Sequence, residues 1–509
     1  MRLTRREFTA LAPGALAGFA LPRFQRPGAI DPPSRADLTA LTLAEASARL
    51  RTGAVTSVQL TEACLARLAI YEPKLDAFIT VLKEQALAQA RALDAERKTG
   101  ASRGPLHGIP IAVKDNIDTA GTRTTAGSAV FEDRIPGDDA PVVTRLKAAG
   151  AVILGKTNLH EFAMGVGETS YFGPPRNPWS LAHNTGGSSS GSGAAVAADL
   201  CYGALGTDTG GSVRIPASFC SIVGLKPTYG LVPIRGIVPL TLSLDHCGPM
   251  TRTVEDAALM LNVMTGYDKL DITSVEHQKE DYVAALRQPV AGFRLGIPAY
   301  FYDHLDTEVA RSAQEALTAL SKLTKSTKDV VLPAFTQVGN VGGAGETYAY
   351  HEEHFKRAAG RYMLPERRRL EAASKSTATA AEYVRAKWSL ELLRRTVDDA
   401  FGDVDVVVVP TVRILPPMLS DMLKAAREGV DRFLTEIVAN TQPFDVYGIP
   451  AVSVPCGFST SGLPIGVTFA GPRFSEGKIL ALARAFEQAT EWHKRRPALS
   501  PATAVPPVI

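Results

Sequence analysis

Three segments of the chain combine residue types that could carry out acyl transfer. Two glycine-rich segments contain Ser188 and Ser212, and a third is an apolar run that ends at Lys114. A serine hydroxyl is a weak nucleophile until a nearby group accepts its proton, and none of the nine histidines stands out near Ser212. A lysine can accept this proton only when it is neutral, and burial in an apolar environment favours the neutral form. These residue types therefore suit a serine hydrolase with a buried lysine base.

Two other motifs suggest different chemistry. Residues 150–157, Gly-Ala-Val-Ile-Leu-Gly-Lys-Thr, match the Walker A pattern of nucleotide-binding proteins, but 151–154 are themselves β-prone, whereas a phosphate loop follows a strand. Residues 187–191, Gly-Ser-Ser-Ser-Gly, match the nucleophile elbow of α/β-hydrolases with Ser189 at the centre, but a polar turn precedes them instead of an apolar strand. Both motifs lack the context that their chemistry requires, and both remain alternatives.

Alternating helices and strands must position these residues. The apolar positions of 41–98 recur at helical spacing. Short apolar runs bounded by glycine and proline follow at 108–114 and 151–154, and a helical segment at 142–149 lies between them. The Gly/Ser-rich segment leads directly into 194–198, which is typical of the start of a buried helix and not of a flexible linker. This alternation predicts an α/β architecture.

The second half of the chain is expected to complete the same sheet. From about 256 to 400 the pattern is mostly helical and more charged. Buried strands are predicted at 403–410, 448–455 and 462–471, and a helix at 478–492. Strands near both ends of the chain therefore indicate one shared sheet.

The order of these segments closely resembles that of the amidase signature family. The resemblance rests on residues 108–116 (GIPIAVKDN), 186–192 (GGSSSGS), 206–216 (GTDTGGSVRIP), 224–230 (GLKPTYG), 243–250 (SLDHCGPM) and 448–456 (GIPAVSVPC). It covers most of the chain after residue 40. It implies one large α/β domain at 29–509, with a central mixed sheet covered by helices on both sides. Within that domain we expect a catalytic core at about 75–250, a more variable helical region at about 256–400 and strands completing the sheet at 403–475.

The resemblance also implies roles for individual residues. Ser212 matches the nucleophile, Ser188 the bridging serine that follows a cis peptide bond after Gly187, and Lys114 the base. Many members have Gly-Gly-Ser-Ser-Gly-Gly-Ser in the bridging segment, whereas this chain has Ser190 in place of a glycine. Because serine allows fewer backbone conformations than glycine, we expect a local difference in this loop.

The glycine-rich turn before the proposed nucleophile is expected to stabilise the oxyanion. In the family, the backbone N–H groups at the positions of Thr209, Gly210, Gly211 and Ser212 serve this purpose. Loss of one such donor typically costs about 100- to 1000-fold in rate, so we expect both glycines to tolerate side chains poorly.

Further residues match family positions less specifically. Asp208, Arg214 and Asp245 are expected to form structural hydrogen bonds near the site, with substrate contact as the alternative. Met164 and Tyr447 are candidates for the substrate pocket, with core packing as the alternative for both.

The implied reaction is hydrolysis of a small-molecule carboxylic amide to an acid and ammonia or an amine, through an acyl-enzyme on Ser212, with no metal or cofactor. Esters and carbamates are further candidate substrates. One alternative is the glutaminase-type subunit of a tRNA-dependent amidotransferase, which would need partner subunits in the cytoplasm. A second is an exported, non-catalytic binding protein with the same fold. The sequence selects neither the substrate nor the oligomeric state.

Composition excludes several other classes of protein. The 509 residues have a formal net charge of +3, and their basic residues are scattered among acidic ones, which argues against nucleic-acid binding. Five cysteines without a CxxC pair suggest neither a disulfide framework nor a zinc site. Beyond the N-terminus, no apolar run reaches the roughly 20 residues of a membrane-spanning helix.

The N-terminus resembles a twin-arginine export signal. Arg5 and Arg6 precede a weakly apolar stretch at 8–21, and we predict a signal and linker at 1–28. Such a signal would direct the folded protein to the periplasm. The alternative is a basic tail that happens to contain adjacent arginines, in which case the protein would stay in the cytoplasm.

Overall fold

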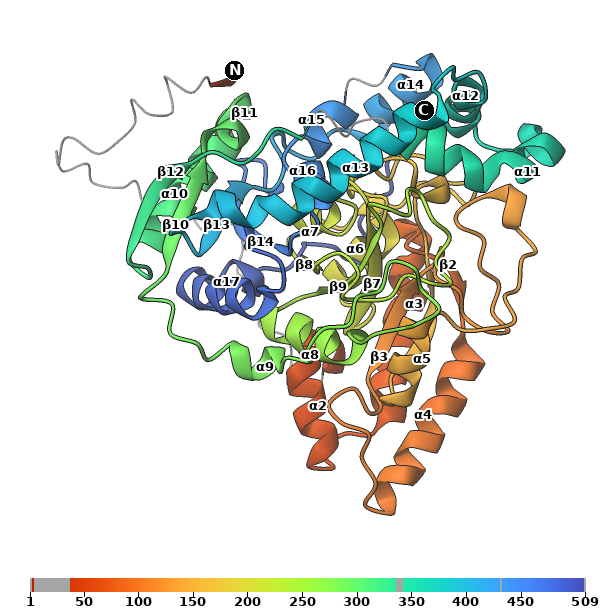
Figure 1. Ribbon diagram of the computed structural model, residues 1–509. Helices are drawn as coiled ribbons and strands as arrows, with labels where there is room; N and C mark the ends of the chain where they lie inside the picture. The colour runs from red at the N-terminus through yellow and green to blue at the C-terminus, as the bar shows by residue number, and fades with distance from the viewer. Residues whose placement is uncertain (1, 4–36, 336–341, 431–432, 508–509) are drawn as a thin grey trace.

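A mixed β-sheet runs through the middle of the molecule (Figure 1). The computed structural model describes residues 2–3, 37–335, 342–430 and 433–507, so the predicted export signal at Arg5 and Arg6 lies outside the described residues. Eleven of the described strands form the sheet in the order β12-β10-β13-β15-β14-β8-β9-β7-β3-β4-β2. Their bounds are β2 (Phe78–Val81), β3 (Pro110–Lys114), β4 (Val152–Thr157), β7 (Gly203–Asp208), β8 (Val223–Lys226), β9 (His246–Thr251), β10 (Arg294–Pro298), β12 (Ser326–Val330), β13 (Val406–Pro410), β14 (Ala451–Phe458) and β15 (Pro464–Ala470).

The sheet is antiparallel in its centre, with a parallel group of strands on each side and the antiparallel strand β2 at the edge next to β4. β3 pairs in parallel with β4 and β7, and β10 pairs in parallel with β12 and β13. The pairs from β13 through β15, β14, β8 and β9 to β7 are antiparallel. Because β3 and β7 are parallel neighbours, their carboxyl ends meet at one edge of the sheet, where Lys114 and Asp208 end the two strands.

Helices flank this sheet along its length. The helices are α2 (Leu43–Arg51), α3 (Ser57–Leu75), α4 (Lys83–Lys98), α5 (Pro141–Ala148), α6 (Ser190–Ala197), α7 (Arg214–Cys220), α8 (Val254–Met264), α9 (Tyr282–Ala285), α10 (Thr307–Ser321), α11 (Tyr348–Ala358), α12 (Leu364–Ser374), α13 (Ala380–Thr396), α14 (Leu419–Glu428), α15 (Leu434–Val438), α16 (Gln442–Tyr447) and α17 (Glu476–Thr490). Two small sheets pair β1 (Arg2–Leu3) with β11 (Leu305–Asp306) and β5 (Arg176–Asn177) with β6 (Ser180–Asn184). Among the described helices, none is both long enough and apolar enough to cross a membrane.

Small residues allow α6 to lie in the interior. Every residue of this Ser-Gly-Ser-Gly-Ala-Ala-Val-Ala helix is buried. A Cβ atom at Gly191 would lie 2.2 Å from the carbonyl oxygen of Ala77, so only glycine permits this approach. The helix begins at Ser190, earlier than the sequence predicts. Since Ser190 lies in the first turn of a helix, its backbone is one that serine adopts readily.

The α/β fold with one mixed sheet shared by both ends of the chain is confirmed. The predicted strands correspond to β3, β4, β13, β14 and β15, and the predicted helices to α5 and α17. The helical prediction for 256–400 is incomplete, because β10 and β12 lie within it and extend the sheet. β12 reads Ser-Thr-Lys-Asp-Val and is largely exposed at the sheet edge, so it lacks the apolar alternation of a buried strand.

Candidate active site

Lys114 lies at the end of β3 and is completely buried. Its Nζ hydrogen-bonds Ser188 Oγ and Thr207 Oγ1, each at 2.7 Å. Burial lowers the pKa of Lys114 to about 7, although the carboxylates of Asp208 and Asp245 partly oppose this shift. A large part of Lys114 is therefore neutral near pH 7, so its nitrogen can accept a proton from the Ser188 hydroxyl.

Ser188 precedes α6 in a turn whose shape depends on glycine. The peptide between Gly187 and Ser188 is cis, as the family resemblance implies. A Cβ atom at Gly187 would lie 2.5 Å from the backbone nitrogen of Gly167. The Ser188 carbonyl accepts a hydrogen bond from the backbone N–H of His160 at 3.2 Å. The turn is thus held against the loop that contains residues 160–167.

Ser212 lies between the end of β7 and the start of α7, on a turn that Asp208 organises. Asp208 Oδ1 accepts a hydrogen bond from the N–H of Gly211 at 2.5 Å, and Oδ2 accepts one from the N–H of Val213 at 3.1 Å. The carbonyl of Ser212 accepts a hydrogen bond from the N–H of Ser189 at 3.3 Å. This last bond joins the Ser212 turn to the segment that carries Ser188, so the structure brings the three predicted residues into one site.

The predicted oxyanion donors divide into two groups. The N–H of Gly211 already donates to Asp208. Within the described part of the chain, the N–H groups of Thr209, Gly210 and Ser212 form no hydrogen bond, and all three residues line the same cavity. Three of the four predicted donors can therefore face a ligand at Ser212.

The two glycines of this turn differ in how they would accept a side chain. Gly211 has φ +125°, and a Cβ atom there would lie 2.2 Å from Thr441 Oγ1. At Gly210 the nearest heavy atom would be Gln442 Cγ, at 4.0 Å. The expectation that both positions exclude side chains therefore holds at Gly211, but at Gly210 the backbone has room for one.

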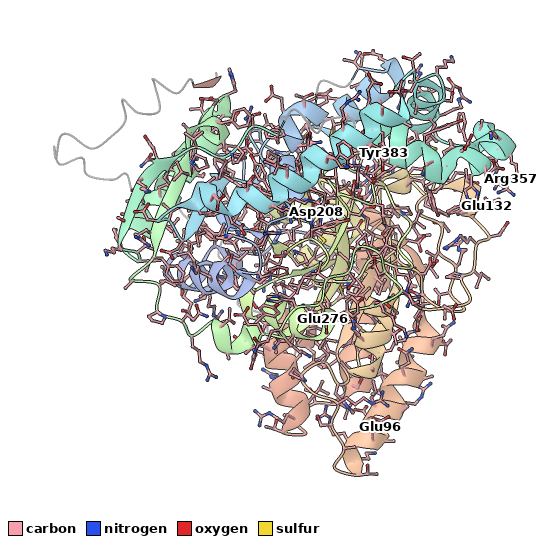
Figure 2. The ribbon with its side chains drawn as sticks, viewed as in Figure 1. Glu96, Glu132, Asp208, Glu276, Arg357 and Tyr383 are labelled. Carbon is pink, nitrogen blue, oxygen red and sulfur yellow. The ribbon has the colours of Figure 1, made fainter. Side chains whose placement is uncertain are left out.

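A buried ionic network fixes this turn to α16. The Arg214 guanidinium bonds both oxygens of Asp208 at 3.0 Å and Asp445 Oδ2 at 2.7 Å. Arg214 holds the pKa of Asp208 well below its usual range. Figure 2 shows Asp208 near the centre of the molecule. Asp208 and Arg214 have the structural role expected from the sequence, whereas Asp445 had no recognisable signal.

Asp245 holds Thr209 in place. Its Oδ1 accepts hydrogen bonds from Thr209 Oγ1 at 2.5 Å and from the N–H of Thr241 at 3.1 Å. Burial raises the pKa of Asp245 to about 7. The site thus contains two buried groups, Lys114 and Asp245, that titrate in the same pH range.

Ser212 opens into a cavity of about 550 Å³ that is mainly apolar. Arg369 is the single charged residue among its described lining residues. The lining consists of Ala163, Met164, Gly165, Val166, Thr209, Gly210, Ser212, Ile215, Leu240, Thr241, Leu244, Phe335, Thr347, Arg369, Leu434, Val438, Gln442 and Val446.

The two pocket candidates have different positions. Met164 lines the cavity. Tyr447 does not: its hydroxyl donates to the carbonyl of Pro333 at 2.6 Å, and its ring packs against Phe335, which is itself a lining residue. Tyr447 therefore supports the cavity wall from behind, in keeping with the alternative of core packing.

The two competing motifs have structural roles. Lys156 of the Walker A pattern lies within β4, fully buried, 3.4 Å from Asp115, and donates to Thr124 Oγ1 at 2.7 Å. Ser189 of the elbow pattern is buried, donates to the carbonyl of Thr207 and accepts from its N–H, both at 3.2 Å. Neither residue lines the cavity at Ser212.

Comparisons with known proteins agree with this geometry. A family model described as Amidase matches residues 59–480. A glutamyl-tRNA(Gln) amidotransferase subunit of Roseiflexus sp. (strain RS-1) is 40% identical over 488 residues, which cover 90% of this chain and 98% of that protein. The native peptide amidase of Stenotrophomonas maltophilia is 34% identical, with a TM-score of 0.75 and coverage of 90% and 98%. A 6-aminohexanoate cyclic dimer hydrolase complexed with substrate is 28% identical, with a TM-score of 0.81 and coverage of 90% and 99%.

Proposed function

The chain belongs to the amidase family, and from this premise we propose that it cleaves a carboxylic amide through an acyl-enzyme on Ser212. The observation that carries the proposal is the buried Lys114, whose pKa is lowered to about 7 and whose Nζ lies 2.7 Å from Ser188 Oγ. A lysine in this state can act as a base near neutral pH, which an ordinary lysine cannot.

In the proposed reaction, Ser212 Oγ attacks the amide carbonyl carbon while its proton passes to Ser188 Oγ, and the Ser188 proton passes to Lys114. The carbonyl oxygen becomes an oxyanion, which the N–H groups of Thr209, Gly210 and Ser212 stabilise. The C–N bond then breaks, and the proton returns through Ser188 to the departing nitrogen. A water molecule attacks the ester in the same way and releases the acid.

The cavity supports a mainly apolar substrate. Its described lining contains many aliphatic side chains and one charge, that of Arg369. A free amino acid presents both a carboxylate and an ammonium, and an ammonium would lack a carboxylate partner among these lining residues. A linear amide with an apolar group next to the scissile bond fits this composition better.

A second function is favoured by sequence similarity. The relative from Roseiflexus is named as a glutamyl-tRNA(Gln) amidotransferase subunit, and this chain is 40% identical to it over nearly its whole length. This likeness supports the glutaminase-type subunit more strongly than it supports a free amidase. In that role the same acyl-enzyme would form from glutamine, and the ammonia would pass to partner subunits.

The deciding experiment compares ammonia release from four substrates: L-glutamine, an apolar primary amide, a peptide C-terminal amide and a carbamate. The wild type is measured beside Ser212→Ala and the matched control Ser189→Ala, and the acyl-enzyme is trapped and located by mass spectrometry. We expect an ester on Ser212, no turnover by Ser212→Ala and near-normal turnover by Ser189→Ala. Full activity of Ser212→Ala would refute the mechanism. Turnover of glutamine alone would select the amidotransferase function.

Export is a separate part of the proposal. We propose that Arg5 and Arg6 direct the folded enzyme to the periplasm, and changing both to lysine should retain it in the cytoplasm. Cell fractionation of the wild type measures this directly. A wild-type protein found wholly in the cytoplasm would remove the export proposal and add weight to the amidotransferase function.

A further inference from the structure

Thr207 lies beside the proposed base, on a strand that is held on both sides. Its strand, β7, lies between β9 and β3 in the sheet (Figure 1). Thr207 is buried, and its hydroxyl oxygen lies 2.7 Å from Lys114 Nζ. The distance from Lys114 Nζ to Ser188 Oγ is also 2.7 Å. The base therefore has two hydroxyl partners, and the proposed reaction uses only Ser188.

The hydrogen bonds that an amine can form give the two hydroxyls different roles. A neutral lysine amine has one lone pair and two N–H groups. In the proposed reaction the lone pair accepts the Ser188 proton, so the bond to Thr207 must be donated by an N–H group. After the transfer Lys114 is an ammonium, which has three donors and no lone pair. The Thr207 oxygen then accepts a hydrogen bond from a full positive charge, and such bonds are stronger than neutral ones.

The titratable groups around Lys114 come from the strands and loops next to β3. They are Asp208, Asp245, Cys247 and the ion pair formed by Asp115 and Lys156. Among the described residues, Lys114 Nζ bonds to Ser188 and Thr207 and to none of these groups. A carboxylate in direct contact would pair with the ammonium and keep the lysine protonated, whereas a hydroxyl stabilises the ammonium without a counter-charge. A hydroxyl at position 207 therefore suits a base that must return to its neutral form.

Asn116 holds the Thr207 hydroxyl from the other side. Its Nδ2 donates to Thr207 Oγ1 at 3.2 Å and to the carbonyl of Val238 at 3.4 Å. Asn116 is buried, and an amide nitrogen donates hydrogen bonds but does not accept them. The Thr207 oxygen thus lies between two donors, Asn116 and Lys114, and is arranged to act as an acceptor.

We propose that Thr207 is a positioning residue of the reaction. Its oxygen accepts a hydrogen bond from Lys114, directs the lone pair of the neutral amine to Ser188, and stabilises the ammonium that forms when the Ser188 proton arrives. The inference rests on the proposed function, because it requires Lys114 to be the base. Without the hydroxyl, the ammonium keeps one of its two partners, so Lys114 becomes a weaker base.

The pH dependence of covalent labelling tests this role. A fluorophosphonate that reacts with activated serines is used to label Ser212, and the rate is measured from pH 5 to 10. Thr207→Val replaces the hydroxyl by a methyl group of similar size. Its midpoint should lie about one pH unit below that of the wild type, and its rate above pH 7 should be about 10- to 100-fold lower. Thr207→Ser retains the hydroxyl and should restore both values.

Thr411→Val is the matched control for the loss of a buried hydroxyl. Thr411 Oγ1 hydrogen-bonds Ser453 Oγ at 2.9 Å and Thr468 Oγ1 at 2.8 Å, and Thr411 is not among the described residues that line the cavity at Ser212. This variant should lose stability in urea but keep the wild-type labelling profile. Circular dichroism checks that each variant folds, and Thr207→Ala is a second variant without the hydroxyl.

The outcomes separate the inference from the proposed function. A wild-type midpoint and rate in Thr207→Val or Thr207→Ala would overturn the role of Thr207, and so would a defect that Thr207→Ser shares. Lys114→Met that labels as fast as the wild type would instead refute Lys114 as the base, and with it the proposed function.

Discussion

The state of Lys114 makes a quantitative prediction about pH. Its pKa is lowered from 10.5 to about 7 because the side chain is completely buried. That shift corresponds to roughly 5 kcal/mol of preference for the neutral amine. If neutral Lys114 is the base, the rate at which Ser212 is acylated should fall about tenfold per pH unit below 7 and level off above it. An unshifted lysine would give a rate that still rises tenfold per unit up to about pH 10.

Covalent labelling follows the same activation of Ser212 as a nucleophile without knowledge of the substrate, because phosphonylation of the hydroxyl also requires loss of its proton. The enzyme is mixed with a fluorophosphonate that reacts with activated serines, and labelled Ser212 is quantified by mass spectrometry from pH 5 to 10. Lys114→Met is the control and should label slowly at every pH, because the variant has no group at this position that titrates. A wild-type rate that is flat from pH 5 to 9, or that continues to rise beyond pH 9, would refute the assignment of Lys114 as the base.

The same lysine predicts how stability depends on pH. Between pH 7 and 10.5, unfolded Lys114 binds a proton that the folded lysine does not. The free energy of unfolding must therefore rise with pH in this window, relative to a variant without the lysine. In urea titrations, the free energy of unfolding of Lys114→Met should exceed that of the wild type by most at pH 7. This difference should shrink by up to about 5 kcal/mol between pH 7 and pH 10. A constant difference would mean that the lysine stays protonated in the folded state.

Further substitutions probe the surroundings of the site. Gly211→Ala should lower the free energy of unfolding, because its Cβ would collide with Thr441 Oγ1. The collision would also displace the neighbouring N–H groups of Gly210 and Ser212, and loss of one such oxyanion donor should cut Ser212 labelling about 100-fold or more. Gly210→Ala should keep wild-type stability in urea, because a Cβ there meets no close neighbour. Asp245→Asn removes a carboxylate that raises the pKa of Lys114, so the midpoint of the labelling profile should move to lower pH; an unchanged midpoint would contradict the coupling. Lys156→Ala leaves the buried carboxylate of Asp115 without its cation, so it should lower the free energy of unfolding in urea by about 3–5 kcal/mol. If the Walker A pattern binds no nucleotide, nucleoside triphosphates should not raise the melting temperature of the wild type.

The strands of the fold could be predicted where burial requires a run of apolar residues. β13, with four valines in a row, and β14 and β15 are buried throughout, so their apolar runs identify them. β12 could not be found in this way because an edge strand needs no apolar face. The early start of α6 was missed for a different reason: its first residues are serine and glycine, which favour turns locally but fit between closely packed elements.

The candidate site was predictable from motifs only in part. The segments of Ser188 and Ser212 are recognisable because their turns need backbone conformations that glycine allows, at Gly186 and Gly211. The segment of Lys114 is recognisable for another reason, since Lys114 ends the buried apolar strand β3. No glycine or apolar pattern identifies Thr207 as a site residue, although its hydroxyl is one of the two hydrogen-bond partners of the Lys114 amine. Ser189 and Ser212 cannot be separated by a local pattern, since their difference is that Ser189 bonds the backbone of β7 while Ser212 faces a cavity.

The reaction class is easier to infer than the substrate because the motifs contain the proposed catalytic residues but not most of the cavity wall. The proposed nucleophile, relay and base all come from residues before 215, in turns that the backbone of β3, β7, α6 and α7 fixes. The far wall of the cavity comes from residues beyond 330, among them Phe335, Arg369, Gln442 and Val446, which lie outside the glycine-rich motifs. A chain can therefore keep the chemistry of an amidotransferase subunit while its cavity selects another amide.

Arg369, as the one charge among the described lining residues, is the position at which the two functions should differ most. Arg369→Ala should abolish activity on a substrate that carries a carboxylate and spare activity on an apolar amide, and steady-state kinetics with both substrate types would measure the contrast.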